Sequence, residues 1–168
     1  MEGEATIKFG TSGWRDVIGK KDGFSIENVR RAVRGIVEYY NEKIEDGYII
    51  IGYDPRLNNR TNAIETARQL AASGIKVKII KNGETPSPVL GYLANTDENI
   101  TGIINFTASH NPHIFGGIKF SPFHGGAASD EVTKPISEFA NAAENYKTMS
   151  YEAGLETGLI EEISVEEA

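Results

Sequence analysis

Ser109 stands out in this sequence because of the residues that surround it. It follows the apolar run 103–106 and is succeeded at once by histidine, asparagine and proline, residues typical of an exposed turn. No Asp or Glu occurs from Asn99 to Ser129, although 24 of the 168 residues are acidic and about four or five would be expected in this window. The window contains all three histidines, and its only formal charge is Lys119. We interpret this segment as a strand followed by a loop that accepts a negatively charged group.

A second polar loop follows the apolar run 7–9 near the N-terminus. Its sequence, GTSGWRD at residues 10–16, combines two glycines, two hydroxyl side chains and Arg15. The glycines permit positive φ or a close approach of the backbone, and the guanidinium of Arg15 has a planar set of donors that suits phosphate. An ordinary turn with a solvated arginine explains this segment equally well when it is considered alone.

A third polar group lies at the end of the β-branched run 48–52. Asp54 and Arg56 flank a proline there, which prevents the strand from continuing. Side chains at the carboxyl end of a buried strand are well placed for a site, but a carboxylate and a guanidinium two residues apart also form a local turn pair. We favour the turn pair over a direct catalytic role.

Hydrolysis and phosphoryl transfer are the two kinds of chemistry to weigh for an exposed serine beside a histidine. The nucleophile of the α/β-hydrolases lies in G-x-S-x-G, whereas Ser109 lies in T-A-S-H-N, so a hydrolase is disfavoured. A phosphoserine carries about −1.5 to −2 charge and is repelled by carboxylates, which explains an acid-free window. On this interpretation Gly116 and Gly117 leave room for a ligand, and Lys119 balances its charge.

The elements that position these loops alternate between helix and strand. Apolar residues at intervals of three and four predict the helices, and clusters of β-branched residues between turn signals predict the strands. This alternation predicts an α/β fold, a three-layer α/β/α sandwich with a mixed, mostly parallel sheet in a single domain, with binding loops at the carboxyl ends of the strands. The predicted helices run from 25 to about 47, from 61 to 72, from about 86 to 93 and from 130 to about 146, and the predicted strands are 48–52, 76–80, 101–106 and 118–121.

Composition and charge restrict the class of protein. Six of the seven net negative charges come from glutamates between Glu152 and Ala168, so residues 1–151 carry a net charge of only −1. Since no basic cluster is present, we expect no nucleic acid partner. No apolar run approaches the roughly 20 residues that span a bilayer, the N-terminus lacks the features of a signal peptide, and cysteine is absent. We therefore expect a cytoplasmic protein with no membrane partner.

Four motifs, FGTSGWR, GYDPR, TASHNP and GGIKFSP, occur in this order along the chain. Together they resemble the first domain of the α-D-phosphohexomutases, the phosphoglucomutase and phosphomannomutase family, over about residues 6–146. TASHNP is the most specific of the four. The resemblance implies an isomerase of carbohydrate metabolism that acts on a hexose phosphate through a bisphosphorylated sugar intermediate, with a hexose bisphosphate as activator.

The resemblance also implies a catalytic role for four residues. Ser109 would be the phosphoserine that donates a phosphoryl group to the sugar and recovers it. Arg15 and Lys119, which match the GTSGxR and GxK positions of the family, would hold the phosphoryl group and polarise the sugar hydroxyl. His110 would assist proton transfer or orient that hydroxyl. A magnesium ion would bind the phosphate oxygens of Ser109.

Asn111 and Pro112 would shape the loop. The family implies no role for His113 or His124, and we expect surface or packing positions for both. A metal pair formed by His110 and His113 is disfavoured because no third ligand lies nearby in the sequence.

The sequence departs from the family in what it lacks. A full member has several hundred residues in four domains, whereas this chain contains no D-G-D-x-D-R metal loop, no G-E-x-S-G sugar loop and no terminal phosphate-binding domain. We expect residues 1–148 to be domain I and residues 149–168 to be an acidic linker, or the start of a missing second domain, with nothing to pack on. The remaining mutase domains are then partners, the magnesium is held mainly by the second of them, and the isolated chain is inactive.

Two other functions stay open. The chain could be a stand-alone, non-catalytic module that binds sugar phosphates or a protein through the same loop, or a scaffold domain to which Ser109 contributes nothing. Within the resemblance, the T-A-S form of the loop favours glucose or mannose phosphates over glucosamine phosphate.

Overall fold

A computed structural model describes residues 5–43, 46–81 and 84–164. Within these ranges six strands form one sheet in the order β1-β5-β4-β2-β3-β6. The strands β4, β2, β3 and β6 are parallel, whereas β5 runs antiparallel to both of its neighbours, β4 and β1. The predicted mixed, mostly parallel sheet is therefore confirmed. The bounds are β1 Trp14–Val17, β2 Tyr48–Tyr53, β3 Lys76–Ile80, β4 Ile100–Phe106, β5 Phe115–Pro122 and β6 Ile160–Ile163.

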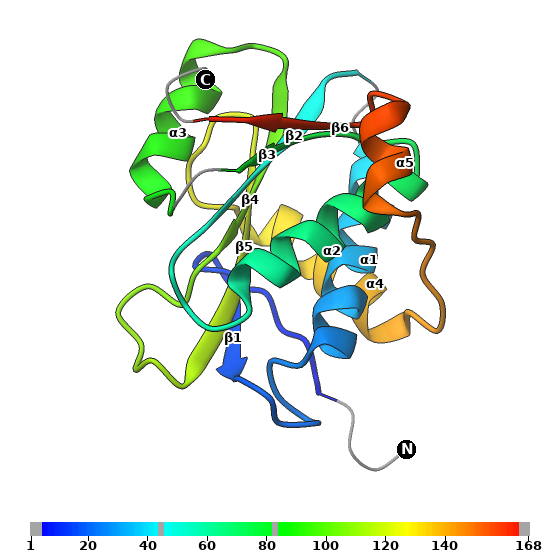
Figure 1. Ribbon diagram of the computed structural model, residues 1–168. Coiled ribbons are helices and arrows are strands. Elements are labelled where there is room, and N and C mark those ends of the chain that lie inside the picture. Colours follow the sequence, from blue (N-terminus) through cyan, green and yellow to red (C-terminus); the bar gives the residue numbers. More distant parts are fainter. Residues whose placement is uncertain (1–4, 44–45, 82–83, 165–168) are drawn as a thin grey trace.

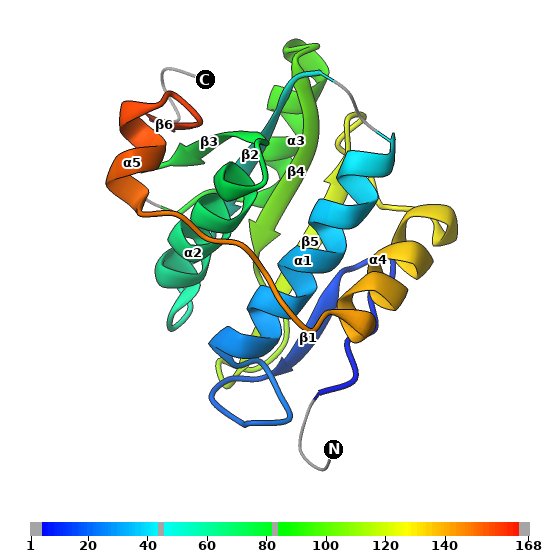
Figure 2. The same ribbon diagram turned by 90° about the vertical axis from the view of Figure 1, so that its right-hand side faces the viewer.

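Helices cover both faces of this sheet, which confirms the three-layer α/β/α sandwich. Figures 1 and 2 show α1, α2, α4 and α5 on one side of the sheet and α3 on the other, so the two helical layers differ in size. None of the helices in the described ranges combines the length and apolar character that a membrane span requires. The helices are α1 Ile26–Lys43, α2 Asn59–Ala72, α3 Ser87–Thr96, α4 Asp130–Ala142 and α5 Tyr151–Glu156.

The central strands are buried on both faces because their side chains alternate between two hydrophobic cores. Ile49 and Ile51 of β2 pack into the large core beneath α1, α2 and α4, and Ile50 packs into the smaller core beneath α3. In β4, Ile104 belongs to the large core and Ile103 to the smaller one. Asn105, two residues after Ile103, therefore faces α3 as well, and this alternation decides which polar side chains of the carboxyl half of β4 reach the site.

Close packing of α1 against α4 completes the larger layer. Ser25 accepts a hydrogen bond at Oγ from the main-chain N–H of Asn28 at 3.3 Å, as expected of a residue that precedes a helix. A Cβ at Gly35 would lie 2.4 Å from the carbonyl oxygen of Ile136, so only glycine permits this helix contact.

The structure corrects the expectation that residues 10–16 are entirely loop. Trp14–Val17 form the edge strand β1, paired antiparallel with β5. The segment carries adjacent charges and no alternating apolar pattern, so its strand character comes from pairing with β5 and from the contact of Trp14 with Phe24, whose ring centroids are 5.1 Å apart.

The structure also corrects the expectation that the acidic segment after residue 148 has nothing to pack on. Ser150 accepts a hydrogen bond from the N–H of Ala153 and begins α5, and β6 then adds to the sheet in parallel with β3. A Cβ at Gly154 would lie 2.4 Å from Ile160, so helix and strand pack closely. The boundary between two domains near residue 148 stays a prediction.

Candidate functional site

Ser109 lies in the loop that joins β4 to β5, at the carboxyl end of β4. Its side chain is exposed, and its φ of 54° is in the left-handed region, which is uncommon for residues other than glycine. The main-chain N–H of Ser109 donates to Oγ1 of Thr107 at 3.0 Å. This hydrogen bond helps to hold the backbone in the conformation that directs the serine hydroxyl outward.

His110 lies next to the serine hydroxyl. Its Nδ1 is 3.4 Å from Oγ of Ser109, a distance longer than that of a strong hydrogen bond. Both side chains are exposed. The imidazole therefore lies beside the hydroxyl, and both groups are accessible to a ligand.

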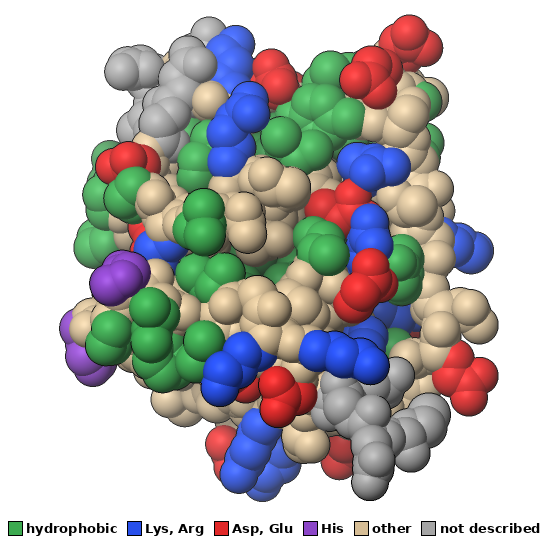
Figure 3. All heavy atoms as spheres, turned by 60° about the horizontal axis from the view of Figure 1, so that its bottom comes forward, with side chains coloured by type: hydrophobic (Ala, Val, Ile, Leu, Met, Phe, Trp, Pro, Cys, Tyr) green, Lys and Arg blue, Asp and Glu red, His purple; other side chains and the backbone are tan. Residues whose placement is uncertain are grey.

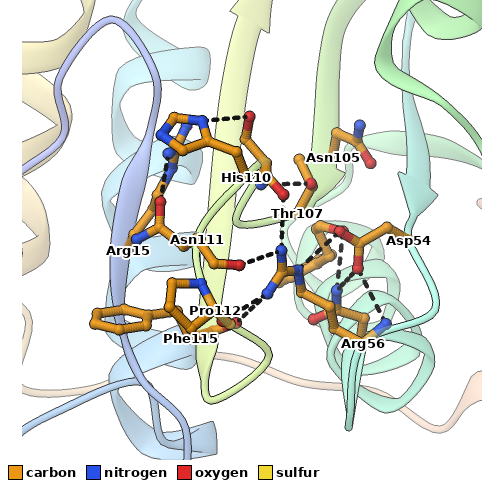
Figure 4. A network of polar contacts seen from close by, with 12 residues as sticks. Arg15, Asp54, Arg56, Asn105, Thr107, His110, Asn111, Pro112 and Phe115 are labelled. Carbon is orange, nitrogen blue, oxygen red and sulfur yellow. Dashed lines mark hydrogen bonds and ion pairs between the residues drawn. The ribbon is translucent and has the colours of Figure 1, made fainter.

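Arg15 reaches the serine loop from β1. Its Nη1 donates to Oδ1 of Asn111 at 3.0 Å (Figure 4). Its Nη2 contacts the carbonyl oxygen of Ser12 at 3.5 Å. The Nε of Arg15 is buried without a hydrogen-bond partner among the described residues. Two segments that are far apart in the sequence thus place a guanidinium beside the serine loop, and its role toward a phosphate stays a prediction.

Lys119 lies on β5, opposite Asn105 of β4, and is half-buried. Gly117 is two residues earlier on β5 and opposite Arg15, so Lys119 and Arg15 project from the same face of the sheet, the face that carries α3. Asn105 donates from Nδ2 to Oγ of Ser87 at 2.7 Å, and its Oδ1 is buried without a partner in the described ranges. The structure thus brings Ser109, His110 and Arg15 together. Lys119 lies on the same face of the sheet as Arg15, two residues beyond the Gly117 that pairs with Arg15.

Asp54 and Arg56 form the predicted turn pair after β2. The Nε of Arg56 is 3.2 Å from Oδ2 of Asp54, and the Arg56 main-chain N–H donates to Oδ1 at 3.1 Å. Asn59 donates to the same Oδ1 at 2.6 Å, so the carboxylate that approaches the site is neutralised and hydrogen-bonded.

Sequence reasoning missed a second set of contacts made by Arg56. Its guanidinium also donates to main-chain carbonyls of the serine loop, including that of Ser109 at 2.7 Å (Figure 4). No local pattern could have indicated this, because the acceptors lie more than 50 residues further along the chain.

The two glycines expected to leave room for a ligand instead accommodate the protein's own chain. A Cβ at Gly116 would lie 2.2 Å from the ring of Phe24, and one at Gly117 would lie 2.3 Å from the carbonyl oxygen of Thr107. Gly116 thus makes room for Phe24 and Gly117 for the backbone that follows β4, which corrects the expectation that they admit a ligand.

The other two histidines make no contact with Ser109 among the described residues. His124 accepts a hydrogen bond at Nδ1 from the N–H of Gly126 and packs edge-on against Phe123, with ring centroids 5.5 Å apart. His113 lines a shallow surface hollow beside Leu57, which is 68% exposed. In Figure 3 histidine side chains lie beside exposed apolar side chains at one margin of the molecule.

The described residues do not form a metal site by themselves. Across the described ranges no three His, Asp or Glu side chains are grouped so that they could hold a metal ion. A hard cation such as magnesium takes several oxygen ligands. The part of the chain that the structure describes therefore fits magnesium only if the oxygens of a phosphate on Ser109 are supplemented by ligands from elsewhere.

The sequence comparisons identify the family. The sequence model of the family described as phosphoglucomutase/phosphomannomutase, alpha/beta/alpha domain I, matches residues 6–147. The chain belongs to this family. The resemblance given by the four motifs is thereby confirmed, and its extent agrees with the matched residues to within one position at the C-terminal side.

Phosphohexomutases also appear among individual relatives. A phosphoglucomutase of Staphylococcus saprophyticus is 30% identical over 167 residues, which cover 97% of this chain and 30% of that protein. A phosphoglucosamine mutase of Marinomonas sp. is 35% identical over 97 residues, which cover 58% of this chain and 21% of that protein.

Solved mutase structures share the fold. A protein of Thermus thermophilus assigned as a phosphomannomutase superposes with a TM-score of 0.81 at 28% identity, over 96% of this chain and 34% of that one. The open form of the Paramecium phosphoglucomutase parafusin superposes with a TM-score of 0.74 at 27% identity, over 95% and 29%. The chain thus spans about a third or less of the length of these family members.

Proposed function

We propose that this chain is the part of a phosphoglucomutase or phosphomannomutase that carries the phosphorylated serine, and that Ser109 is that serine. The observation that supports the proposal most is an exposed hydroxyl at the tip of a loop that is hydrogen-bonded to two arginines from separate segments, Arg15 and Arg56. Phosphoryl transfer depends mainly on positioning and charge neutralisation, and a restrained loop without carboxylates provides both.

In the proposed step the bond between phosphorus and Oγ of Ser109 breaks as a bond forms between phosphorus and a hydroxyl oxygen of the hexose phosphate. The hydroxyl loses a proton and Oγ gains one, so no other reactant is consumed. His110, with Nδ1 3.4 Å from Oγ, carries this proton or orients the hydroxyl. Arg15 and Lys119 hold the phosphoryl group and polarise the hydroxyl. The step is reversed when the bisphosphorylated sugar returns a phosphoryl group to Ser109.

Magnesium and the other mutase domains complete the proposed enzyme. Magnesium supplies charge neutralisation to phosphoryl transfer when it is bound. This chain would contribute the phosphate oxygens on Ser109, and the remaining ligands would come from the other domains. The isolated 168-residue chain is therefore expected to show no conversion of glucose 1-phosphate to glucose 6-phosphate, even with magnesium and a hexose bisphosphate activator. Measurable turnover by the purified chain would contradict this expectation.

Phosphopeptide mass spectrometry of the protein purified from its own cells tests the assignment of Ser109. We expect phosphate on Ser109, loss of that phosphate in Ser109→Ala, and retention in the matched control Ser73→Ala, whose serine lies at the far end of α2. Phosphate on a different serine would exclude the proposed role. Binding of hexose phosphates without any phosphorylation of Ser109 would favour the non-catalytic module instead.

A further inference from the structure

Every N–H group of the Arg56 guanidinium has a hydrogen-bond acceptor. Nη1 donates to the carbonyl oxygens of Pro112 at 2.9 Å and Phe115 at 3.2 Å. Nη2 donates to those of Ser109 at 2.7 Å and Asn111 at 2.9 Å, and Nε donates to Asp54 (Figure 4). The Arg56 side chain is only 14% exposed. Because its five donors are occupied, this arginine is not available to bind a phosphate directly.

The orientation of one peptide group follows from these contacts. In a planar trans peptide the carbonyl and the N–H of the next residue point in opposite directions. The carbonyl of Ser109 is directed toward Arg56, so the N–H of His110 is directed away from it. That N–H has no acceptor among the residues described, whereas the N–H of Ser109 is occupied by Thr107.

The left-handed conformation of Ser109 places this free N–H where it can bind an anion. Successive backbone N–H groups around a residue with positive φ, such as Ser109, can form a small anion-binding concavity. Because the N–H of Ser109 is taken by Thr107, the N–H of His110 is the group that remains to donate to an anion there. A hydrogen bond from a main-chain N–H to a phosphate oxygen is short and charge-assisted, and it adds no flexible side chain to the site.

We propose that Arg56 is a positioning residue that turns the main-chain N–H of His110 toward the phosphate carried by Ser109. The inference rests on the proposed function of Ser109 and adds a donor and its support to that site. Arg56 acts from behind the loop, through four carbonyls at once, and lysine cannot replace it because an ammonium lacks the planar set of five donors.

The test uses the full chain with phosphoserine incorporated at position 109 during translation, so that it does not depend on whether a sugar bisphosphate delivers the phosphate. The measurements are ³¹P and ¹H–¹⁵N NMR titrations between pH 4 and 8. We expect the His110 amide proton to move downfield as the phosphate becomes dianionic. We expect the second pKa of the phosphate to lie below the usual value of about 6, by roughly 0.5 or more.

Arg56→Lys should abolish most of both effects, whereas the matched control Arg60→Lys, on the exposed side of α2, should keep them. An unmoved His110 amide in the wild-type chain, or an unchanged titration in Arg56→Lys, would overturn the inference. If Arg56→Lys fails to fold, Asp54→Asn removes the carboxylate that holds Nε and leaves the loop acceptors intact. It should weaken both effects in the same direction, and no change would again overturn the inference.

The proposed function fails separately. If Ser109 is not phosphorylated in the protein from its own cells, the role of the serine is lost, whatever the NMR titration shows for the geometry of the loop.

Discussion

Arg15 and Asn111 are 96 residues apart in the chain, yet Nη1 of the arginine donates a hydrogen bond to the side-chain Oδ1 of the asparagine at 3.0 Å. This contact joins the edge strand β1 to the loop that carries Ser109. The position of the arginine and the conformation of the loop therefore depend on each other.

A double-mutant cycle measures that dependence. Arg15→Met and Asn111→Ala should each destabilise the chain, and their combined effect should fall short of additivity by about 0.5–1.5 kcal/mol, because either change removes the same hydrogen bond. Urea unfolding followed by circular dichroism gives the free energies. Arg15→Met combined with Asn41→Ala, on the exposed side of α1, serves as the control and should be additive. Additivity in the first pair would show that the contact is not formed in solution.

Gly117→Ala should destabilise the protein by about 1–3 kcal/mol. The new Cβ would lie 2.3 Å from the carbonyl oxygen of Thr107, and a backbone atom cannot move away as easily as the end of a side chain. At Gly10, where no atom lies within 4 Å of an added Cβ and φ is not positive, alanine should change the free energy of unfolding by less than about 0.5 kcal/mol. Equal effects at the two positions in urea unfolding would contradict the packing of β1 and β4 around β5.

Ser109→Gly should raise the free energy of unfolding by about 0.5–1 kcal/mol. A serine with φ near 54° carries the strain of the left-handed region, which glycine relieves, although glycine also gains freedom in the unfolded chain. Ser109→Ala keeps a Cβ in the same conformation and should bring no such gain. Thermal unfolding of both variants and of the wild type measures these differences. An alanine variant more stable than the glycine variant would exclude strain at this position.

Asp97 should contribute to the loss of stability in acid. The hydroxyl of Tyr48 donates to its carboxylate at 2.5 Å, and this bond, together with hydrogen bonds from the main chain and side chain of Asn99 and the charge of Lys78, lowers the pKa of Asp97 despite partial burial. A carboxyl whose pKa is lower in the folded chain stabilises the fold above its unfolded pKa of about 3.9, and this contribution disappears as pH falls toward the folded value.

Asp97→Asn should therefore be less stable than wild type at pH 7 and should lose less stability between pH 5 and pH 3. Urea unfolding at these pH values measures both effects. Glu98→Gln is the control, because Glu98 is exposed and makes no hydrogen bond within the described ranges. If both variants respond to acid in the same way, the Tyr48 contact does not stabilise the charged form.

Local patterns predicted much of the fold. The β-branched run of β2, the three-and-four spacing of α1 and the turn residues around Ser109 depend on neighbours in the chain, so their structures could be predicted without knowledge of the rest. The lack of acids around Ser109 likewise identified the loop that binds Arg15 and Arg56.

Remote partners decided what the sequence did not show. Strand β1 exists because β5 lies beside it, and β6 exists because β3 offers an edge to a short segment that is half glutamate. The space at Gly116 is filled by Phe24, which no spacing rule connects to it.

The sequence by itself therefore determined the α/β class and the family, because these depend on short motifs and periodicity. It also singled out Ser109, whose phosphorylation stays a prediction. Only the tertiary structure decided how the serine loop is held. Four of the five N–H donors of Arg56 bind carbonyls that become its neighbours when β2 and β4 pair. Hydrogen bonds between segments so far apart produce no pattern in the sequence of either segment.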